Sequence, residues 1–190
     1  MKVLVFGDTH MPTRRSSIPS EFFEYIAATD YDLAFVTGDL VREPDMRAAL
    51  PPLPRTIMVR GNMDYSSSSE SFHRELSLEA FNILLIHGTQ LRPRGNIEQL
   101  WEIADNIGAH VTIYGHTHKA AIDLHKSKLF LNPGTLSGAS SGGGGRTDAS
   151  FMELALKKNL IDVVLFKTNW KVMKRSSLSF IKEDGMKRRE

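Results

Sequence analysis

The feature that most constrains this sequence is a set of six short apolar segments. Each is followed closely by a glycine and by an aspartate, asparagine or histidine. Runs of aliphatic and β-branched residues this short are typical of buried strands. The segments cover residues 2–6, 33–36, 56–60, 82–86, 111–114 and 128–131. In open α/β sheets, ligands bind beyond the carboxyl ends of the strands. We therefore expect the six segment ends to lie side by side around one hollow.

The residues that follow these segments carry carboxylates, an amide and imidazoles. The candidate site residues are Asp8, His10, Asp39, Asn62, His87, His116 and His118. His116 and His118 form the sharpest pair, because residues two apart in an extended chain point to the same side and can present both rings to one point. Taken singly, Asp and Asn after a strand are usually turn formers. The repetition at six strand ends favours a shared site instead.

This set of side chains suits transition metals. It is too rich in nitrogen for Ca²⁺ and lacks the thiolates that Cu⁺ prefers. Mn²⁺, Fe²⁺, Co²⁺, Ni²⁺ and Zn²⁺ all fit such a donor set. Seven side chains exceed the three or four that one catalytic ion takes from a protein. We expect two ions about 3.5–4 Å apart that share one carboxylate, an arrangement that suits displacement at phosphorus.

Bulk properties narrow the class of protein. The 190 residues fit one domain, residues 1–190, and the absence of cysteine excludes disulfides and thiolate metal sites. The net charge of +2 is too small to attract a nucleic-acid backbone strongly, so a nuclease acting on long nucleic acid is disfavoured. The chain starts with an apolar strand and has no long apolar stretch, so we expect a cytoplasmic protein without a membrane segment.

Other segments predict the rest of the fold. Asn96 is placed to cap a helix over residues 97–107, and Gly108 is placed to end it. The serine-rich residues 65–71 and the glycine-rich residues 137–146 are expected to be loops. Residues 151–156 and 161–166 predict a hairpin, and residues 170–176 an edge strand; we expect these late strands to form a second sheet.

Together, five motifs resemble the calcineurin-like metallophosphoesterase superfamily. They are Asp8-x-His10, Gly38-Asp39, Gly61-Asn62-x-Asp64, His87-Gly88 and Gly115-His116-Thr117-His118. Within the superfamily, the chain is most similar to the small single-domain prokaryotic phosphodiesterases and to their relative, the small subunit of the retromer complex. The resemblance implies an α/β fold, a four-layer α/β/β/α sandwich of two mixed β-sheets flanked by helices.

The resemblance also implies how the site residues divide between two metal ions. The first ion would be bound by Asp8, His10, Asp39 and His118, and the second by Asp39, Asn62, His87 and His116, with Asp39 shared. Asp39, Asn62 and His87 are the expected catalytic residues, and the resemblance makes Mn²⁺ the first expectation for the two ions, with Ni²⁺, Fe²⁺, Zn²⁺ or Co²⁺ as alternatives. Many superfamily members place a histidine after the motif asparagine as the general acid, whereas this chain has Met63, which cannot donate a proton.

The function implied is that of a metal-dependent phosphoesterase. We expect a phosphodiesterase that hydrolyses small diesters, with nucleotide-derived and cyclic diesters as candidate substrates, by in-line attack of a hydroxide held between two metal ions. The alternative is a non-catalytic scaffold like the retromer subunit, which presents an apolar surface to a protein partner. The intact ligand set favours the enzyme, because a scaffold has no need for such a polar cluster. The oligomeric state stays open.

Overall fold

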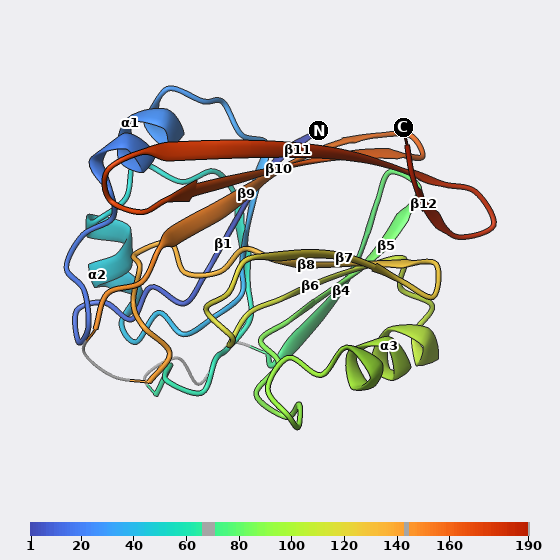
Figure 1. Cartoon of the computed structure of the whole chain (residues 1–190), viewed down its shortest axis with the longest axis horizontal. Coiled ribbons are helices and arrows are strands. Elements are labelled where there is room, and N and C mark those ends of the chain that lie inside the picture. Colours follow the sequence, from blue (N-terminus) through green and yellow to red (C-terminus); the bar gives the residue numbers. More distant parts are fainter. Residues whose placement is uncertain (66–70, 143–144, 190) are drawn as a thin grey trace.

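The computed structural model describes residues 1–65, 71–142 and 145–189. Two mixed β-sheets dominate it, with helices outside them (Figure 1). The first sheet has the strand order β12-β11-β10-β9-β1-β2-β3 and the second β4-β5-β6-β8-β7. The first contains β1 (Lys2–Phe6), β2 (Leu33–Val36), β3 (Thr56–Met58), β9 (Ala149–Lys157), β10 (Leu160–Thr168), β11 (Met173–Lys182) and β12 (Met186–Arg188). The second contains β4 (His73–Leu78), β5 (Phe81–Ile86), β6 (Val111–Tyr114), β7 (Ala121–His125) and β8 (Lys128–Asn132).

Within the described residues, three helices cover the outer faces: α1 (Ser20–Ala27), α2 (Glu43–Ala48) and α3 (Ile97–Asn106). The alternation of side chains along each strand divides the interior into layers. Val3 and Val5 of β1 face the core between the sheets, while Leu4 and Phe6 pack with α1 and α2. In β5, residues 83 and 85 join the central core, and residues 84 and 86 pack with α3. These layers confirm the α/β/β/α sandwich.

The late strands are arranged differently from the prediction. They do not form the second sheet; β9 pairs antiparallel with β1, with Val3 opposite Leu154, and extends the first sheet. Because β1 is apolar on both faces, it lies inside a sheet, with β2 along one edge and β9 along the other. The predicted edge strand at residues 170–176 begins later, at Met173, and the edge itself is β12.

The six strand ends are also divided between sheets. Three belong to the first sheet (β1, β2 and β3) and three to the second (β5, β6 and β8). They surround the site because the two sheets pack face to face, not because all six strands are neighbours in one sheet. The expectation that all six strand ends lie side by side was therefore wrong, because the strands are divided between two sheets.

The predicted helix after Asn96 is confirmed. The Asn96 side chain accepts hydrogen bonds from the backbone N–H groups of Glu98 and Gln99, and Gly108 adopts a left-handed φ of 65°. Most of the serine-rich segment, residues 66–70, lies outside the described residues. Helices in the described parts of the chain are all too short or too polar to cross a bilayer.

Candidate metal centre

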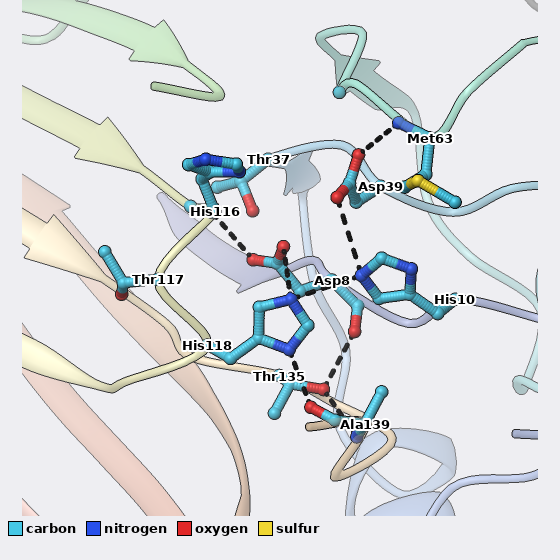
Figure 2. Close-up of polar contacts among 12 residues, drawn as sticks. Asp8, His10, Thr37, Asp39, Met63, His116, Thr117, His118, Thr135 and Ala139 are labelled. Atoms are coloured by element: carbon cyan, nitrogen blue, oxygen red, sulfur yellow. Dashed lines mark hydrogen bonds and ion pairs between the residues drawn. The ribbon is translucent and has the colours of Figure 1, made fainter. Parts of the chain in front are cut away.

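Six of the seven predicted ligands come together in two adjoining groups. Asp8, His10, Asp39 and His118 form one, and Asp39, His87 and His116 form the other, with the ligand atoms of each group within 4.8 Å of one another. All six residues are buried. Figure 2 shows the side chains of Asp8, His10, Asp39 and His118 directed toward one another. Asp39 belongs to both groups, as expected for a carboxylate shared between two ions.

Backbone carbonyls orient two of the histidine rings. His87 Nδ1 lies 2.7 Å from the carbonyl oxygen of Thr37, and His118 Nδ1 lies 2.6 Å from that of Ala139. A carbonyl only accepts, so Nδ1 must carry the proton in both rings. The remaining nitrogen, Nε2, is then the one available to a metal, and this carbonyl–histidine arrangement is the usual one behind metal ligands.

The distances inside the cluster leave polar atoms without suitable partners. Asp8 Oδ1 and His87 Nε2 are buried and make no hydrogen bond with the described residues. His87 Nε2 lies 3.5 Å from Asp39 Oδ1, and His118 Nε2 lies 3.4 Å from Asp8 Oδ1, beyond usual hydrogen-bond lengths. Buried polar atoms without partners are costly. A divalent cation would satisfy them, and the donor set of imidazoles and carboxylates fits a transition metal.

The backbone at the cluster is strained. Five of the candidate ligands are in the left-handed region with φ between 49° and 68°: Asp8, His10, Asp39, His116 and His118. A non-glycine residue in this region costs about 1–2 kcal/mol. Hydrogen bonds between the loop after β1 and the loop after β2 hold this conformation at Asp8 and His10, since the Asp8 N–H donates to the Gly38 carbonyl and the His10 N–H to the Asp39 carbonyl. Strain concentrated at one cluster indicates a functional site.

Two details differ from the sequence prediction. His116 and His118 lie beyond β6 in left-handed conformations, not in extended chain, and their rings reach different groups rather than one point. Asn62 is exposed, and its Oδ1 accepts a long hydrogen bond of 3.5 Å from the Thr89 hydroxyl. The hydrogen bond places Asn62 beside the loop after His87, and its role as a ligand stays a prediction.

Asp64 was not among the predicted site residues, yet it holds the site loops together. Its buried carboxylate accepts four backbone hydrogen bonds of 2.7–2.9 Å, from Asp39, Leu40, Val41 and Gly61. It thereby ties the loop after β2 to the loop after β3. Gly61 permits the close approach, because an added Cβ would overlap the backbone nitrogen of Asp39. The signal in the sequence that could have pointed to this role was that Asp64 belongs to the Gly61-Asn62-x-Asp64 motif but was assigned to neither metal ion.

Charges within the metal-free cluster are set by burial and by neighbours. Burial raises the pKa of Asp8 to about 7. Burial alone would raise the pKa of Asp39, but His87 and the Met63 N–H, which donates to Asp39, lower it to about 2. Burial opposes charge on His87, but Asp39 and Asp8 outweigh it and raise the pKa of His87 to about 9. At neutral pH the metal-free site therefore holds a proton on His87.

Metal binding is expected to release protons. The pKa of His87 is raised to about 9 and that of Asp8 to about 7, so below these values an ion must displace protons from both groups. The Kd for Mn²⁺ should therefore rise as pH falls from 9 to 6, by about tenfold per pH unit for each proton released. Calorimetric titration in buffers of different ionisation enthalpy measures the released protons directly.

The stability of the metal-free protein should fall as pH rises, whereas its affinity for Mn²⁺ should increase. A raised histidine pKa stabilises the fold fully below the unfolded value of 6.5, and this contribution is lost as pH rises through about 9. With EDTA the Tm should therefore fall between pH 7 and 9, whereas the gain in Tm from added Mn²⁺ should grow. A Kd for Mn²⁺ that stays constant from pH 6 to 9 would contradict this account of the site.

Comparison with known proteins gives a consistent assignment. Residues 1–157 match the model of the calcineurin-like phosphoesterase superfamily domain. A probable metallophosphoesterase of Methanothermobacter thermautotrophicus is 35% identical over 181 residues, which cover 95% of this chain and 99% of the relative. A second one, from Methanocaldococcus jannaschii, is 33% identical over 71% of this chain and 68% of its own length.

A solved structure has the same architecture. Wild-type Vps29 of Entamoeba histolytica in complex with Zn²⁺ superposes with a TM-score of 0.83 at 28% identity, covering 94% of this chain and 99% of Vps29. The likeness therefore extends over both sheets. From the family match, the two archaeal relatives and the shared fold, the chain belongs to the calcineurin-like phosphoesterase superfamily.

Proposed function

We propose that this phosphoesterase is a phosphodiesterase that hydrolyses small diesters at a site holding two divalent metal ions. The observation that carries the proposal is Asp39, whose two carboxylate oxygens face different groups of ligands. Oδ2 lies 3.5 Å from His10 Nε2, and Oδ1 lies 3.5 Å from His87 Nε2. A carboxylate between two sets of imidazoles is the geometry that a shared ligand requires.

The chain's own residues prepare the site for this reaction. When bound, the two ions would supply an activated water and neutralise charge on the phosphoryl oxygens. The carbonyls of Thr37 and Ala139 fix His87 and His118 with Nε2 toward the cluster. The Met63 N–H donates to Asp39 Oδ1 at 2.7 Å and holds that carboxylate in place. These contacts set the ligand geometry before substrate arrives, as a preorganised site requires.

Hydrolysis of bis(4-nitrophenyl) phosphate with added Mn²⁺ tests the proposal. We expect turnover that EDTA removes and Mn²⁺ restores, with 4-nitrophenyl phosphate, the matching monoester, as a slower substrate. The absence of turnover from protein shown to contain bound metal would overturn the assignment as a phosphodiesterase.

The residue at position 63 is expected to limit the range of leaving groups. Met63 has no proton to donate, so the proton of an alkyl leaving group must come from water or from another residue, or the group must leave without one. General acid catalysis from this position, typically worth about 10²–10⁴-fold, is missing. We expect wild type to prefer aryl over alkyl diesters strongly. Met63→His should raise the rate on alkyl diesters about tenfold or more and leave aryl diesters nearly unchanged.

Steady-state kinetics on matched aryl and alkyl diesters measures both effects. Met63→Leu is the control, because it keeps an apolar side chain of similar size. Equal rates on aryl and alkyl diesters in wild type would show that leaving-group protonation is already supplied, or not needed, and would contradict the prediction.

A protein-interaction scaffold is the second candidate, because the likeness to Vps29 extends over 94% of the chain. Metal-dependent hydrolysis distinguishes the scaffold from the phosphodiesterase. A scaffold would bind a stoichiometric protein partner and show no diester hydrolysis with metal bound. The buried, strained ligand cluster favours the enzyme, since a docking surface gains nothing from it.

A further inference from the structure

One edge of the first sheet is only partly covered, and its backbone and charge point to a ligand. We infer that the free edge of β11, residues 173–178, binds an extended acidic segment of a protein partner as an added strand. This surface is distinct from the metal centre, because β9 and β10 separate β11 from β1 in the strand order. The inference therefore goes beyond the proposed function and does not rest on it.

The short strand β12 covers only the last part of β11. The β11 strand runs over Met173–Lys182, whereas β12 pairs with residues 180–182 near one end of it (Figure 1). One further hydrogen bond, from the Arg189 N–H to the Ser179 carbonyl, extends this contact. Within the described chain, residues 173–178 pair only with β10. Their other side presents backbone groups to which a further strand can bind.

The alternation along β11 identifies the backbone groups at the free edge. The Ser179 carbonyl accepts the Arg189 N–H, so the backbone groups of Ser179 point away from β10. Successive residues of a strand direct their N–H and C=O groups to opposite sides in the plane of the sheet. Ser177 and Arg175, which lie two and four residues before Ser179, therefore direct these groups to the free edge.

A hollow beside the free edge leaves room for an added strand. It has a volume of about 730 Å³ and is lined by Ser177, Leu178, Ser179, Arg188 and Arg189. Arg188 is opposite Phe180 and so lies on the same face of the sheet as Leu178, whereas Ser177 and Ser179 lie on the other face. A hollow lined from both faces lies in the plane of the sheet, where an added strand would continue the line of β12.

The side chains beside the free edge are basic. Four of them are exposed cations: Lys174, Arg175, Arg188 and Arg189. Lys174 lies directly opposite Lys167 of β10, and like charges in opposite positions destabilise a sheet. A negatively charged ligand would reduce this repulsion.

Carboxylates in this part of the sheet already have partners. These pairs are Asp148 with Lys167, Glu183 with Lys187, and Asp162 with the Ser179 hydroxyl. In the part of the chain that the structure describes, no carboxylate forms an ion pair with the four cations beside the free edge. Their charge is therefore available to a ligand.

An unpaired backbone edge and these cations together favour an acidic strand. Main-chain hydrogen bonds to a sheet edge give an extended peptide its affinity, and complementary charge gives specificity. The same cations repel the identical edge of a second copy of this chain. Nucleic acid fits less well, because the lining residues of the hollow include no aromatic ring on which a base could stack.

Fluorescence anisotropy with the full chain tests the inference. The probe is a short fluorescein-labelled peptide of alternating glutamate and threonine, because threonine favours extended strands. We expect saturable binding, at least about tenfold tighter than that of the same peptide with lysine in place of glutamate. On binding, the Ser177 N–H should exchange with solvent more slowly, as a hydrogen bond to the added strand requires.

Three variants separate the backbone contribution from the charge contribution. Ser177→Pro removes an N–H that points away from β10 and should abolish binding of the acidic peptide, since proline is tolerated on edge strands but cannot donate. Arg188→Gln should weaken this binding by about two- to fivefold. Arg55→Gln is the matched control, because Arg55 is exposed and precedes β3 at the opposite edge of the same sheet, and it should bind like wild type.

Two results would overturn the added strand. The first is equal affinity for the acidic and lysine peptides, and the second is wild-type affinity in folded Ser177→Pro. If this variant does not fold, an unchanged exchange rate of the Ser177 N–H in the wild-type complex overturns the strand by itself.

Other outcomes would assign the edge to a different ligand. Tighter binding of single-stranded oligo(dT) than of the acidic peptide would assign it to nucleic acid, and self-association that Ser177→Pro removes would assign it to a second copy of this chain. Either result would overturn the inference. Hydrolysis of bis(4-nitrophenyl) phosphate by the same preparations reports on the proposed function separately.

Discussion

Asp39→Asn is expected to abolish diester hydrolysis and to weaken the binding of both metal ions while the protein stays folded. Asp39 is the residue common to both ligand groups, so its substitution removes an anionic ligand from each. Loss of a hydrogen-bond partner behind a ligand already costs about 10–100-fold in metal affinity or activity, and loss of the shared ligand should cost more. Equilibrium dialysis against Mn²⁺ and hydrolysis of bis(4-nitrophenyl) phosphate measure the two effects.

The fold should tolerate this variant because Asn is nearly the same shape as Asp. Its amide oxygen can still accept the Met63 N–H, and asparagine tolerates the left-handed φ of 54° at this position. Asp30→Asn is the matched control, since Asp30 is exposed and no hydrogen bond or ion pair of its side chain occurs among the described residues. Wild-type turnover by Asp39→Asn would exclude Asp39 as the shared ligand.

Asp64→Asn is expected to cause the largest loss of stability among single isosteric changes at the site. Each carboxylate oxygen of Asp64 accepts two backbone N–H groups: Oδ1 those of Leu40 and Val41, and Oδ2 those of Asp39 and Gly61. An amide nitrogen at either position would face two donors. With at least two buried N–H groups left unpaired, we expect a loss of about 3 kcal/mol in the free energy of unfolding.

Thermal and urea unfolding of the metal-free proteins measure this loss. The Tm should fall by on the order of 10 °C in a chain of this size. Mn²⁺ affinity should fall as well, because the loop that carries Asp39 loses its fixed position. Asp30→Asn serves again as the control for removal of a carboxylate. A Tm within about 1 °C of wild type would refute the role of Asp64 in joining the two loops.

The site was largely predictable because its chemistry recurs at strand ends. Six of the seven candidate ligands converge although they come from four separate segments of the chain. The cap at Asn96 is a local signal and predicted α3, whereas the four-layer sandwich was implied by the family resemblance. The family resemblance supplied the division of ligands into two groups around Asp39.

The rest depends on long-range pairing that no local pattern encodes. That β9 pairs with β1, and not with a strand of the second sheet, is a choice between apolar edges that look alike in sequence. The left-handed φ at His116 and His118 overrides the expectation of extended chain. Asp64 was part of a recognised motif, but its role was not predicted, because its partners are backbone N–H groups, which any residue provides.

The number of Mn²⁺ ions bound by the wild-type chain at saturation tests the central claim most directly. Equilibrium dialysis at pH 8 with elemental analysis of the protein gives this number. The two ligand groups joined at Asp39 predict two ions per chain. A plateau at one ion, or at none, would contradict the shared-ligand site.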